Sequence, residues 1–369
     1  MRPLVVLVRC QALAALASFL VANPQAQQVP RLDLRMKEEK PLSGNPVAEA
    51  IFGQTKCDSR GNLYFRTGLR GGLAAPIFKV SPEGEVKAAF SVKGVKGFER
   101  ATATIYDFAV GLRGQVHLIV RKCEDGKSRK CQVDILTFSE DAAYQSATRL
   151  ELERDFDPSR LAVFPTGEFL VAGLRDKEAE TPEASVAQAA KHSPPVQEPY
   201  TAIFDSSGRV RAEVTLPLDS KRLTEGGSEK ESDSLGLAVQ LGMVAIGEDG
   251  NIYLSHHTAR PVVYVISSSG VLLRQLQIMS PTESAWPMTM TYAAGGRLVF
   301  GFAEKLEEGL YNTGSAIYSL VDAETGERLI DYQSAPGIGG VFVCYTPSGF
   351  TFLASTKDGH MAIRQAVPR

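Results

Sequence analysis

Short apolar segments alternate with polar turns along almost the whole chain, and many of these turns end in glycine. The stretch CDSRGNLYF, from Cys57 to Phe65, returns in similar form as GEDGNIYLS, from Gly247 to Ser255. In both, a polar turn precedes a segment rich in aromatic and β-branched residues, which predicts a β-hairpin. The glycine supplies the positive φ that such turns require. Equivalent turns end at six anchor glycines: Gly61, Gly114, Gly167, Gly250, Gly296 and Gly349.

The anchor glycines are regularly spaced. Their successive separations are 53, 53, 83, 46 and 53 residues, and the long interval contains two polar insertions. A second glycine turn follows in most units, whereas the second unit has the weaker LTFSEDAAYQSA there. Each unit therefore predicts four short strands, a to d, with tight turns joining a to b and c to d. Such repeated units are typical of β-propeller blades. The second-turn glycines are Gly84, Gly208, Gly270 and Gly326.

The sixth unit is one strand short. The segments Val341–Tyr345, Phe350–Ser355 and a third from Met361 account for its strands a to c. The N-terminal segment Val29–Met36 has no partner in the first unit, and beside the last strand it would complete the sixth blade and hide a sheet edge. The sequence thus predicts an all-β, six-bladed β-propeller of four-stranded antiparallel blades, closed by its N-terminal strand. A sandwich or two stacked β domains would not explain the spacing.

The repeating units resemble those of six-bladed propellers of the NHL-repeat and TolB-like group. The fourth unit, EDGNIYLSHHTARPVVYVISSSGVLL, carries the best match, and the first, DSRGNLYFRTG followed by APIFKVSPEGEVKAAF, comes next. The resemblance covers about residues 29–369. It implies the fold and leaves the activity open, because such propellers host binding proteins and enzymes alike.

The N-terminus has a different character from the repeats. Arg2 and Arg9 precede an apolar run from Ala12 to Ala22, and small residues lead to Ala26. This pattern predicts a cleaved secretory signal over residues 1–26, followed by a single propeller domain over 27–369. The run is short for a membrane span, although an uncleaved anchor is the alternative reading. We therefore expect a secreted or periplasmic protein, including association with the cell envelope, and no stable membrane span after signal removal.

Charge and cysteine content narrow the picture further. The formal net charge is −2 and no basic patch is present, so nucleic acid is excluded as a partner. In an oxidising compartment, Cys123 and Cys131 would close the polar loop EDGKSRK with a disulfide, the alternative being two free thiols. Cys57 and Cys344 fall on strands a of neighbouring blades. Because inner strands diverge and a Cα separation above about 7 Å forbids the bond, we expect these two to be buried free cysteines.

The predicted strand order places the b–c loops and the links between blades on one face, and this face carries most of the unusual sequence. It includes polar insertions at about 177–199 and 218–236. The composition predicts disorder for 218–236, and Glu183–His192 predicts a short helix within the first insertion. Loops on a rigid scaffold usually hold binding residues. Our candidates for a polar, aromatic rim on this face are Arg70, Tyr106, Asp107, His256, His257, Trp286, Tyr311, Asn312 and His360.

Among these candidates, Trp286 is the only tryptophan and precedes strand a of the fifth unit, at the channel mouth. It predicts a binding platform, with ordinary packing as the alternative. His256 and His257 are adjacent and would point to opposite sides of a regular strand, so we predict no metal site from them.

Catalytic motifs are missing from the sequence. There is no G-x-S-x-G elbow, no H-E-x-x-H, no P-loop and no dinucleotide fingerprint, so we predict no catalytic residue, metal or cofactor. The leading hypothesis is a non-catalytic binding scaffold for a protein, peptide or glycan. The alternatives are a metal-dependent hydrolase, lactonase or lyase with carboxylates from several blades at the channel mouth, and an accessory role in a cell-envelope assembly.

Overall fold

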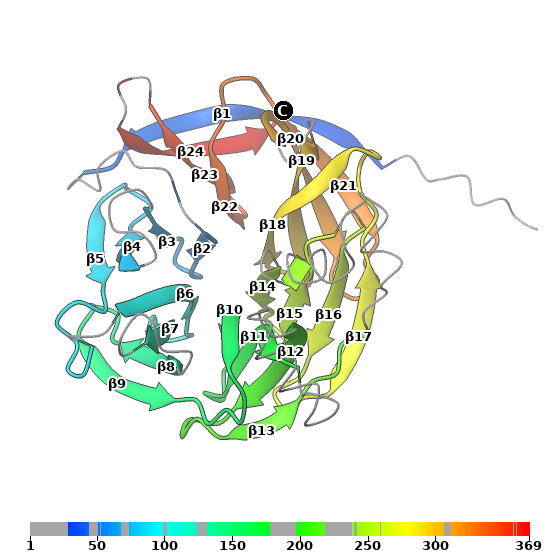
Figure 1. Cartoon of the computed structure of the whole chain (residues 1–369). Coiled ribbons are helices and arrows are strands. Elements are labelled where there is room, and N and C mark those ends of the chain that lie inside the picture. The colour runs from blue at the N-terminus through cyan, green and yellow to red at the C-terminus, as the bar shows by residue number, and fades with distance from the viewer. Residues whose placement is uncertain are drawn as a thin grey trace, which may run out of the picture.

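The computed structural model describes residues 29–369 apart from 44–50, 52, 68–73, 99–101, 124–130, 178–196, 218–237, 240–241, 259, 306–310, 357 and 359. Within these residues the fold is all-β, and helical backbone conformation occurs only at Ala74, Ala238 and Val239. None of the described helical structure is long and apolar enough to cross a membrane. The sheets are arranged around a common centre in the manner of a propeller (Figure 1). The predicted signal at 1–26 lies outside the described residues.

Four of the sheets have four antiparallel strands each, in sequence order from the centre outward. The first contains β2 (Lys56–Cys57), β3 (Leu63–Arg66), β4 (Ile77–Val80) and β5 (Val86–Phe90). The second contains β6 (Thr102–Val110), β7 (Val116–Cys123), β8 (Cys131–Phe138) and β9 (Tyr144–Arg149). The third contains β10 (Phe156–Val163), β11 (Phe169–Asp176), β12 (Gln197–Phe204) and β13 (Val210–Glu213). The fourth contains β14 (Met243–Ile246), β15 (Ile252–Ser255), β16 (Val262–Ile266) and β17 (Leu272–Gln277).

The remaining strands form one eight-stranded sheet, in the order β18-β19-β20-β21-β1-β24-β23-β22. The N-terminal strand β1 pairs antiparallel with β24, as the sequence predicted, with Leu34 opposite Pro368. It also pairs parallel with β21, where Leu34 lies opposite Ser334, and this contact was not predicted. One strand therefore covers two sheet edges and joins them. The members are β1 (Arg31–Pro41), β18 (Ala285–Ala293), β19 (Arg297–Lys305), β20 (Tyr311–Asp322), β21 (Arg328–Ser334), β22 (Val341–Thr346), β23 (Gly349–Ser355) and β24 (Met361–Pro368).

The apolar core lies between neighbouring sheets. Successive side chains of a strand point to opposite faces, so β3 serves two interfaces at once. Tyr64 packs with residues of the second sheet, such as Leu118. Leu63 and Phe65 pack with Val343 of β22, in a cluster that joins the first and last segments of the ring. Leu63 and Phe65 therefore pack between the first unit and the last one.

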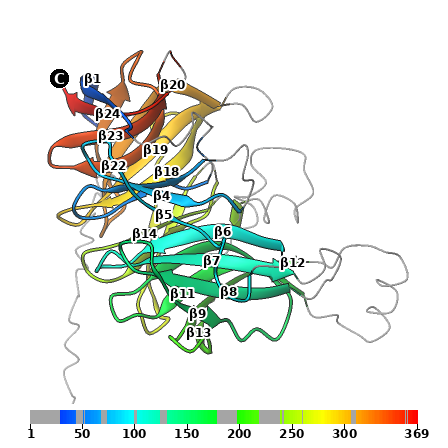
Figure 2. The same cartoon turned by 90° about the vertical axis from the view of Figure 1, so that its left-hand side faces the viewer.

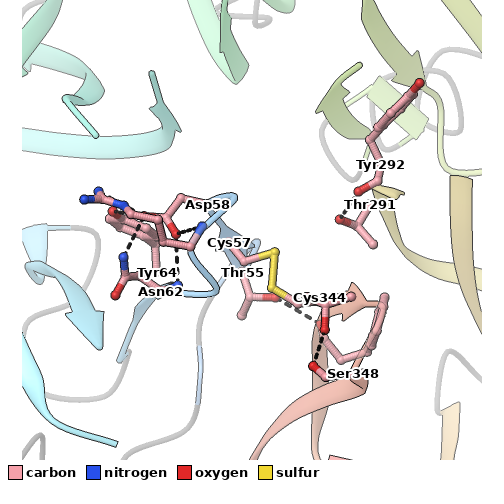
Figure 3. The surroundings of a disulfide bond; sticks show 12 residues. Thr55, Cys57, Asp58, Asn62, Tyr64, Thr291, Tyr292, Cys344 and Ser348 are labelled. Atoms are coloured by element: carbon pink, nitrogen blue, oxygen red, sulfur yellow. Dashed lines mark hydrogen bonds and ion pairs between the residues drawn. A yellow bond between two sulfur atoms is a disulfide. The ribbon is translucent and has the colours of Figure 1, made fainter. Parts of the chain in front are cut away.

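The phrase that recurs in the sequence forms the same turn twice, with the carboxylate supplied from different positions. In the first turn, Asp58 accepts hydrogen bonds from the Asn62 side chain at 2.8 Å and the Tyr64 hydroxyl at 3.1 Å (Figure 3). In the fourth sheet, Asp249 makes the equivalent bonds to Asn251 and Tyr253 at 2.8 and 3.0 Å. A Cβ on Gly247, which stands where the first turn has Asp58, would lie 2.3 Å from the Asp249 carboxylate. The turn thus needs one carboxylate at this point, from either position.

The outer turns, from c to d, pack onto the sheet before them in the ring. A Cβ added to Gly208 would clash with the carbonyl oxygen of Arg149 in the second sheet. A Cβ added to Gly84 would likewise lie only 2.9 Å from the carbonyl oxygen of Pro41 in β1. The backbone bonds match as well, because Glu151 donates to Gly208 at 2.8 Å just as Ser43 donates to Gly84 at 2.9 Å. Strand β1 therefore supports the first sheet as an outer strand supports its neighbour elsewhere in the ring.

The second unit lacks the outer-turn glycine, and Ala142 occupies its place with φ +62°. Among the described residues it is the only one other than glycine with a positive φ. The left-handed conformation costs an L-residue roughly 1–2 kcal/mol. The weak turn noted in the sequence is thus formed at an energetic cost.

Ala142→Gly should raise the free energy of unfolding by about 0.5–1 kcal/mol. The gain from relieving the left-handed strain exceeds the larger chain entropy that glycine gives the unfolded state. Urea denaturation measures the change. Gly94→Ala is the matched control: Gly94 has φ +85° and open space around a built Cβ, so this variant should lose stability. A loss for Ala142→Gly would contradict the strain argument.

Two disulfides are present. Cys123 and Cys131 lie opposite each other on β7 and β8, with a Cα separation of 4.4 Å, which agrees with the predicted pair. Cys57 on β2 is bonded to Cys344 on β22, with a Cα separation of 6.0 Å (Figure 3). The expectation of free cysteines there was wrong. The inner strands of these two sheets do not diverge, because β2 approaches the centre of the ring and lies close to β22 (Figure 1).

Removing the Cys57–Cys344 bond should destabilise the fold more than removing the Cys123–Cys131 bond. The two bonds span 287 and 8 residues, so they restrict the unfolded chain very differently. The chain-entropy relation gives about 5–6 kcal/mol for the long bridge and about 2–3 kcal/mol for the short one. Urea denaturation of Cys57→Ala/Cys344→Ala and Cys123→Ala/Cys131→Ala compares them. A larger loss for the short bridge would refute this ranking.

Candidate functional site

The segment from Gln54 to Cys57 reaches into the centre of the ring and contacts the inner edges of other sheets (Figure 1). The Thr55 hydroxyl donates to the carbonyl oxygen of Phe342 in β22 at 3.1 Å. The Gln54 amide donates at 2.7 Å to the carbonyl oxygen of Gly242, just before β14. These bonds satisfy backbone groups on the free inner edges of the sheets.

Lys56 is the most connected side chain of this segment. Its ammonium lies 3.2 Å from the Asp107 carboxylate and donates to the carbonyl oxygens of Phe108 and, at 3.3 Å, of Leu161. Asp107 also accepts a hydrogen bond from the Leu161 backbone N–H at 2.9 Å. One ion pair therefore ties β2 to β6 and β10. Burial lowers the pKa of the Lys56 ammonium, and the Asp107 charge opposes that effect.

Lys56 is unusual for its position in the repeat. Lys56 lies five residues before its anchor glycine, and most equivalent positions hold small residues. Ala109 and Ala162 pack in apolar clusters between sheets, and Cys344 is bonded to Cys57, so Lys56 is the one long charged side chain at this position. The equivalent residues are Ala109, Ala162, Ala245, Thr291 and Cys344.

Arg160 is a second cation at the centre, seven residues before its anchor glycine and equivalent to Asp107. It follows a bulge in β10 between Pro158 and Arg160. Its guanidinium donates to the carbonyl oxygens of Gly242 and Ser159. Burial lowers its pKa, and the Asp107 charge raises it again. Among the described residues, no carboxylate forms a salt bridge with Arg160.

The predicted rim residues are distributed over different places. Asp107 belongs to the centre, whereas Tyr106 lies on the β6 bulge and faces Arg121 and Asp157. Burial and a hydrogen bond to Asp157 raise the pKa of Tyr106 to about 12. Arg121 in turn pairs with Asp155 at 2.9 Å. Tyr106 thus belongs to an ionic cluster between the second and third sheets.

The two adjacent histidines have separate environments. His256 is buried edge-on against Tyr264, with ring centroids 5.4 Å apart, and burial lowers its pKa to about 4. His257 lies against Trp286, with ring centroids 5.5 Å apart. The structure therefore brings together His257 and Trp286 from neighbouring sheets, and it keeps His256 in the core.

The other candidates do not join this pair. His360 is exposed and its backbone N–H donates to the Thr356 hydroxyl at 3.1 Å. Tyr311 and Asn312 open β20, where their backbones pair with Lys305 and Glu304. Arg70 lies outside the described residues, as does Glu183–His192. Residues Gln197–Pro199 of the first predicted insertion belong to strand β12. In the described part of the chain, no three His, Cys, Asp or Glu residues form a group suited to a metal ion.

On the face opposite the a–b turns, the strands of different units end at different heights. The b strands start at the same point after the anchor glycine, but β7 and β11 have eight residues where β3 and β15 have four. Four extra residues extend a strand by about 13 Å. The fifth unit is also long, because β19 has nine residues. By strand length, the second, third and fifth units therefore extend further on this face than the first and fourth. Figure 2 shows the long strands β6 and β7 of the second unit from the side.

Comparisons with known proteins support the fold only. No family model matches the chain, and no curated protein matches it. A protein of unknown function from Dyadobacter fermentans has a similar structure, with a TM-score of 0.50, 13% identity and coverage of 91% of this chain and 99% of that one. A DUF4221 family member from Bacteroides vulgatus has a TM-score of 0.49 and 8% identity, with coverage of 92% of this chain and 98% of that one. A PQQ-bound aldose sugar dehydrogenase from Streptomyces coelicolor has a TM-score of 0.44 and 10% identity, with coverage of 91% of this chain and 98% of that one.

Sequence reasoning missed Lys56 and Arg160, although a signal for both was present. Counting backward from the anchor glycines aligns the inner strands. At the position five residues before the anchor glycine, Lys56 is the one long side chain among small residues. At the position seven residues before it, Arg160 and Asp107 are the charged residues. The remaining residues seven back from the anchor are Gln54, Met243, Thr289 and Phe342.

Lys56→Met should lower the free energy of unfolding by about 3 kcal/mol, because it leaves the Asp107 carboxylate, 3% exposed, without its cation. The double variant Lys56→Met/Asp107→Asn should recover much of this loss, since asparagine keeps an acceptor for Leu161 and carries no charge. Urea denaturation of the single and double variants gives the coupling energy. Lys87→Met, which removes an exposed pair with Glu85, is the control and should leave stability unchanged. If the double variant lost as much free energy of unfolding as the two single variants together, the pairing of Lys56 with Asp107 would be disproved.

Proposed function

We propose that the chain is an exported, six-bladed β-propeller of the NHL-repeat and TolB-like kind that acts as a non-catalytic binding scaffold. In this proposal residues 1–26 form the signal and 27–369 form one domain, with the eight-stranded sheet counted as blades five and six sharing β1. Two disulfides and the lack of a membrane-spanning helix among the described residues are consistent with export.

The observation that carries this proposal is the uneven face with Trp286 and His257 on its low side. Trp286 opens strand β18 of a tall unit, and His257 follows β15 of the neighbouring short unit. Their rings lie together at the level where the short strands end. An aromatic pair flanked by a taller hairpin offers apolar area and a polar tip, the features enriched at binding hot spots. The proposed ligand is a protein, peptide or glycan.

The ionisable groups at the ring centre favour binding over catalysis. The Asp107 carboxylate accepts bonds from Lys56 and from a backbone N–H, so it is already engaged as a structural acceptor. The described residues offer no cluster that favours the alternative of a metal-dependent hydrolase, lactonase or lyase, and we do not propose it.

Trp286→Ala should weaken ligand capture strongly while leaving the fold intact. Immobilised wild-type and variant proteins are exposed to an envelope extract and to a glycan array, and bound material is quantified. A central aromatic anchor is worth about 2 kcal/mol or more, so binding should fall by about thirtyfold.

Tyr144→Ala is the matched control, because Tyr144 is an aromatic residue, 42% exposed, on the outer strand β9. Its capture should equal that of the wild type. Equal capture by the Trp286 variant, with an unchanged melting temperature, would rule out this face as the binding surface.

A further inference from the structure

The centre of the ring carries more positive than negative charge. Lys56 and Arg160 both reach it, and Asp107 is the nearby carboxylate. Asp107 forms its salt bridge with Lys56, at 3.2 Å. Arg160 is left with two backbone carbonyl oxygens, from Gly242 and Ser159. Carbonyl groups accept hydrogen bonds but supply no compensating charge, so one unit of positive charge remains at the centre among the described residues.

This charge cannot be removed by proton loss at physiological pH. A guanidinium stays protonated in proteins, and a desolvated cation is normally paired because isolation from water is costly. The residues equivalent to Arg160 on the other inner strands provide no second carboxylate, since Gln54, Met243, Thr289 and Phe342 are uncharged. Among the described residues Arg160 therefore has no carboxylate of its own, and an external anion would supply the missing charge.

Two inner strands carry exposed residues at this level, although Ser159, the residue before Arg160, is buried. The residue before Arg160 lies eight before its anchor glycine, and the equivalent residues of β18 and β22 are Met288 and Val341. These two side chains are 41% and 38% exposed. The Lys56 side chain is 15% exposed, and Arg160 is also partly exposed. The cation is therefore desolvated enough to favour an anion and open enough to receive one.

We infer that the ring centre is a binding site for an oxyanion, a carboxylate or phosphate group, held by the guanidinium of Arg160. The planar fork of donors on arginine matches the two oxygens of such a group. The Gly242 carbonyl, which also accepts a bond from Gln54, fixes the guanidinium, and the Lys56–Asp107 pair fixes the strand beside it. This inference deepens the proposed binding function by naming a group that the ligand carries.

The test uses the full mature protein in calorimetric titrations at constant ionic strength. One arm titrates inorganic phosphate, and the other titrates a capped tripeptide with a free C-terminal carboxylate and, beside it, the same peptide as its amide. Saturable binding of phosphate or of the free-carboxylate peptide, with none by the amide, is expected. Binding of phosphate alone identifies a free anion as the ligand, and binding of the peptide identifies a group on a larger molecule.

Arg160→Gln should weaken this binding by about tenfold or more, because it removes a charge-assisted hydrogen-bond donor. Arg160→Lys keeps the positive charge but lacks the planar guanidinium, so its affinity for the anion should lie between those of the wild type and Arg160→Gln. Arg149→Gln, at a largely exposed arginine on β9, is the control and should bind as the wild type does. Undiminished binding in Arg160→Gln, or no saturable binding by the wild type, would overturn the inference.

A crystal of the wild-type protein soaked in tungstate gives a second readout that does not depend on any variant folding. An anomalous peak within hydrogen-bond distance of Arg160 is expected, and a featureless map there would also overturn the inference. The outcome is independent of the Trp286 experiment. Anion binding at Arg160 together with unchanged capture by Trp286→Ala would leave the ring-centre site standing and reject the proposed binding face.

Discussion

The arrangement of the sheets depends on one short segment that crosses the centre of the ring. Between Gln54 and Cys57, consecutive side chains bond to the inner edges of sheets two, three and four and of the strand β22. Inner strands present unpaired backbone groups, which need partners when water access is limited. Here the partners come from side chains of the first unit. The sheets are thus held by a shared hub as well as by the apolar layers between neighbours.

The contacts of this segment contribute more to the specific arrangement of the sheets than to the free energy of unfolding. A buried ion pair such as Lys56–Asp107 contributes little net free energy, because desolvation offsets the attraction. Its geometric demand is strict, however, since Lys56 must meet a carboxylate and two carbonyl oxygens from different strands. The Cys57–Cys344 bond then fixes the same segment covalently to the other end of the chain.

The repeating turns could be predicted from the sequence because their chemistry is local. Gly61 and Gly250 both have the expected positive φ, and the N-terminal strand pairs with the last strand as its missing partner suggested. The parallel contact of β1 with β21 and the Cys57–Cys344 bond could not be predicted this way. Both depend on how closely non-neighbouring segments converge, which a turn pattern does not encode. The position of Tyr106 could not be predicted either, because the β6 bulge directs its side chain toward Arg121 and Asp157 while the neighbouring Asp107 lies at the centre.

The repeat nevertheless locates the candidate site once its register is known. In a ring of similar units, a given position of strand a meets a similar environment in each unit, so small apolar residues are the default there. A long charged residue at such a position breaks that equivalence and must find charge from another unit. Lys56 does so in Asp107, whereas Arg160, at the position equivalent to Asp107, forms no salt bridge with a carboxylate among the described residues. The repeat therefore makes the charge of Arg160 informative, because the equivalent positions of the other units hold no second carboxylate.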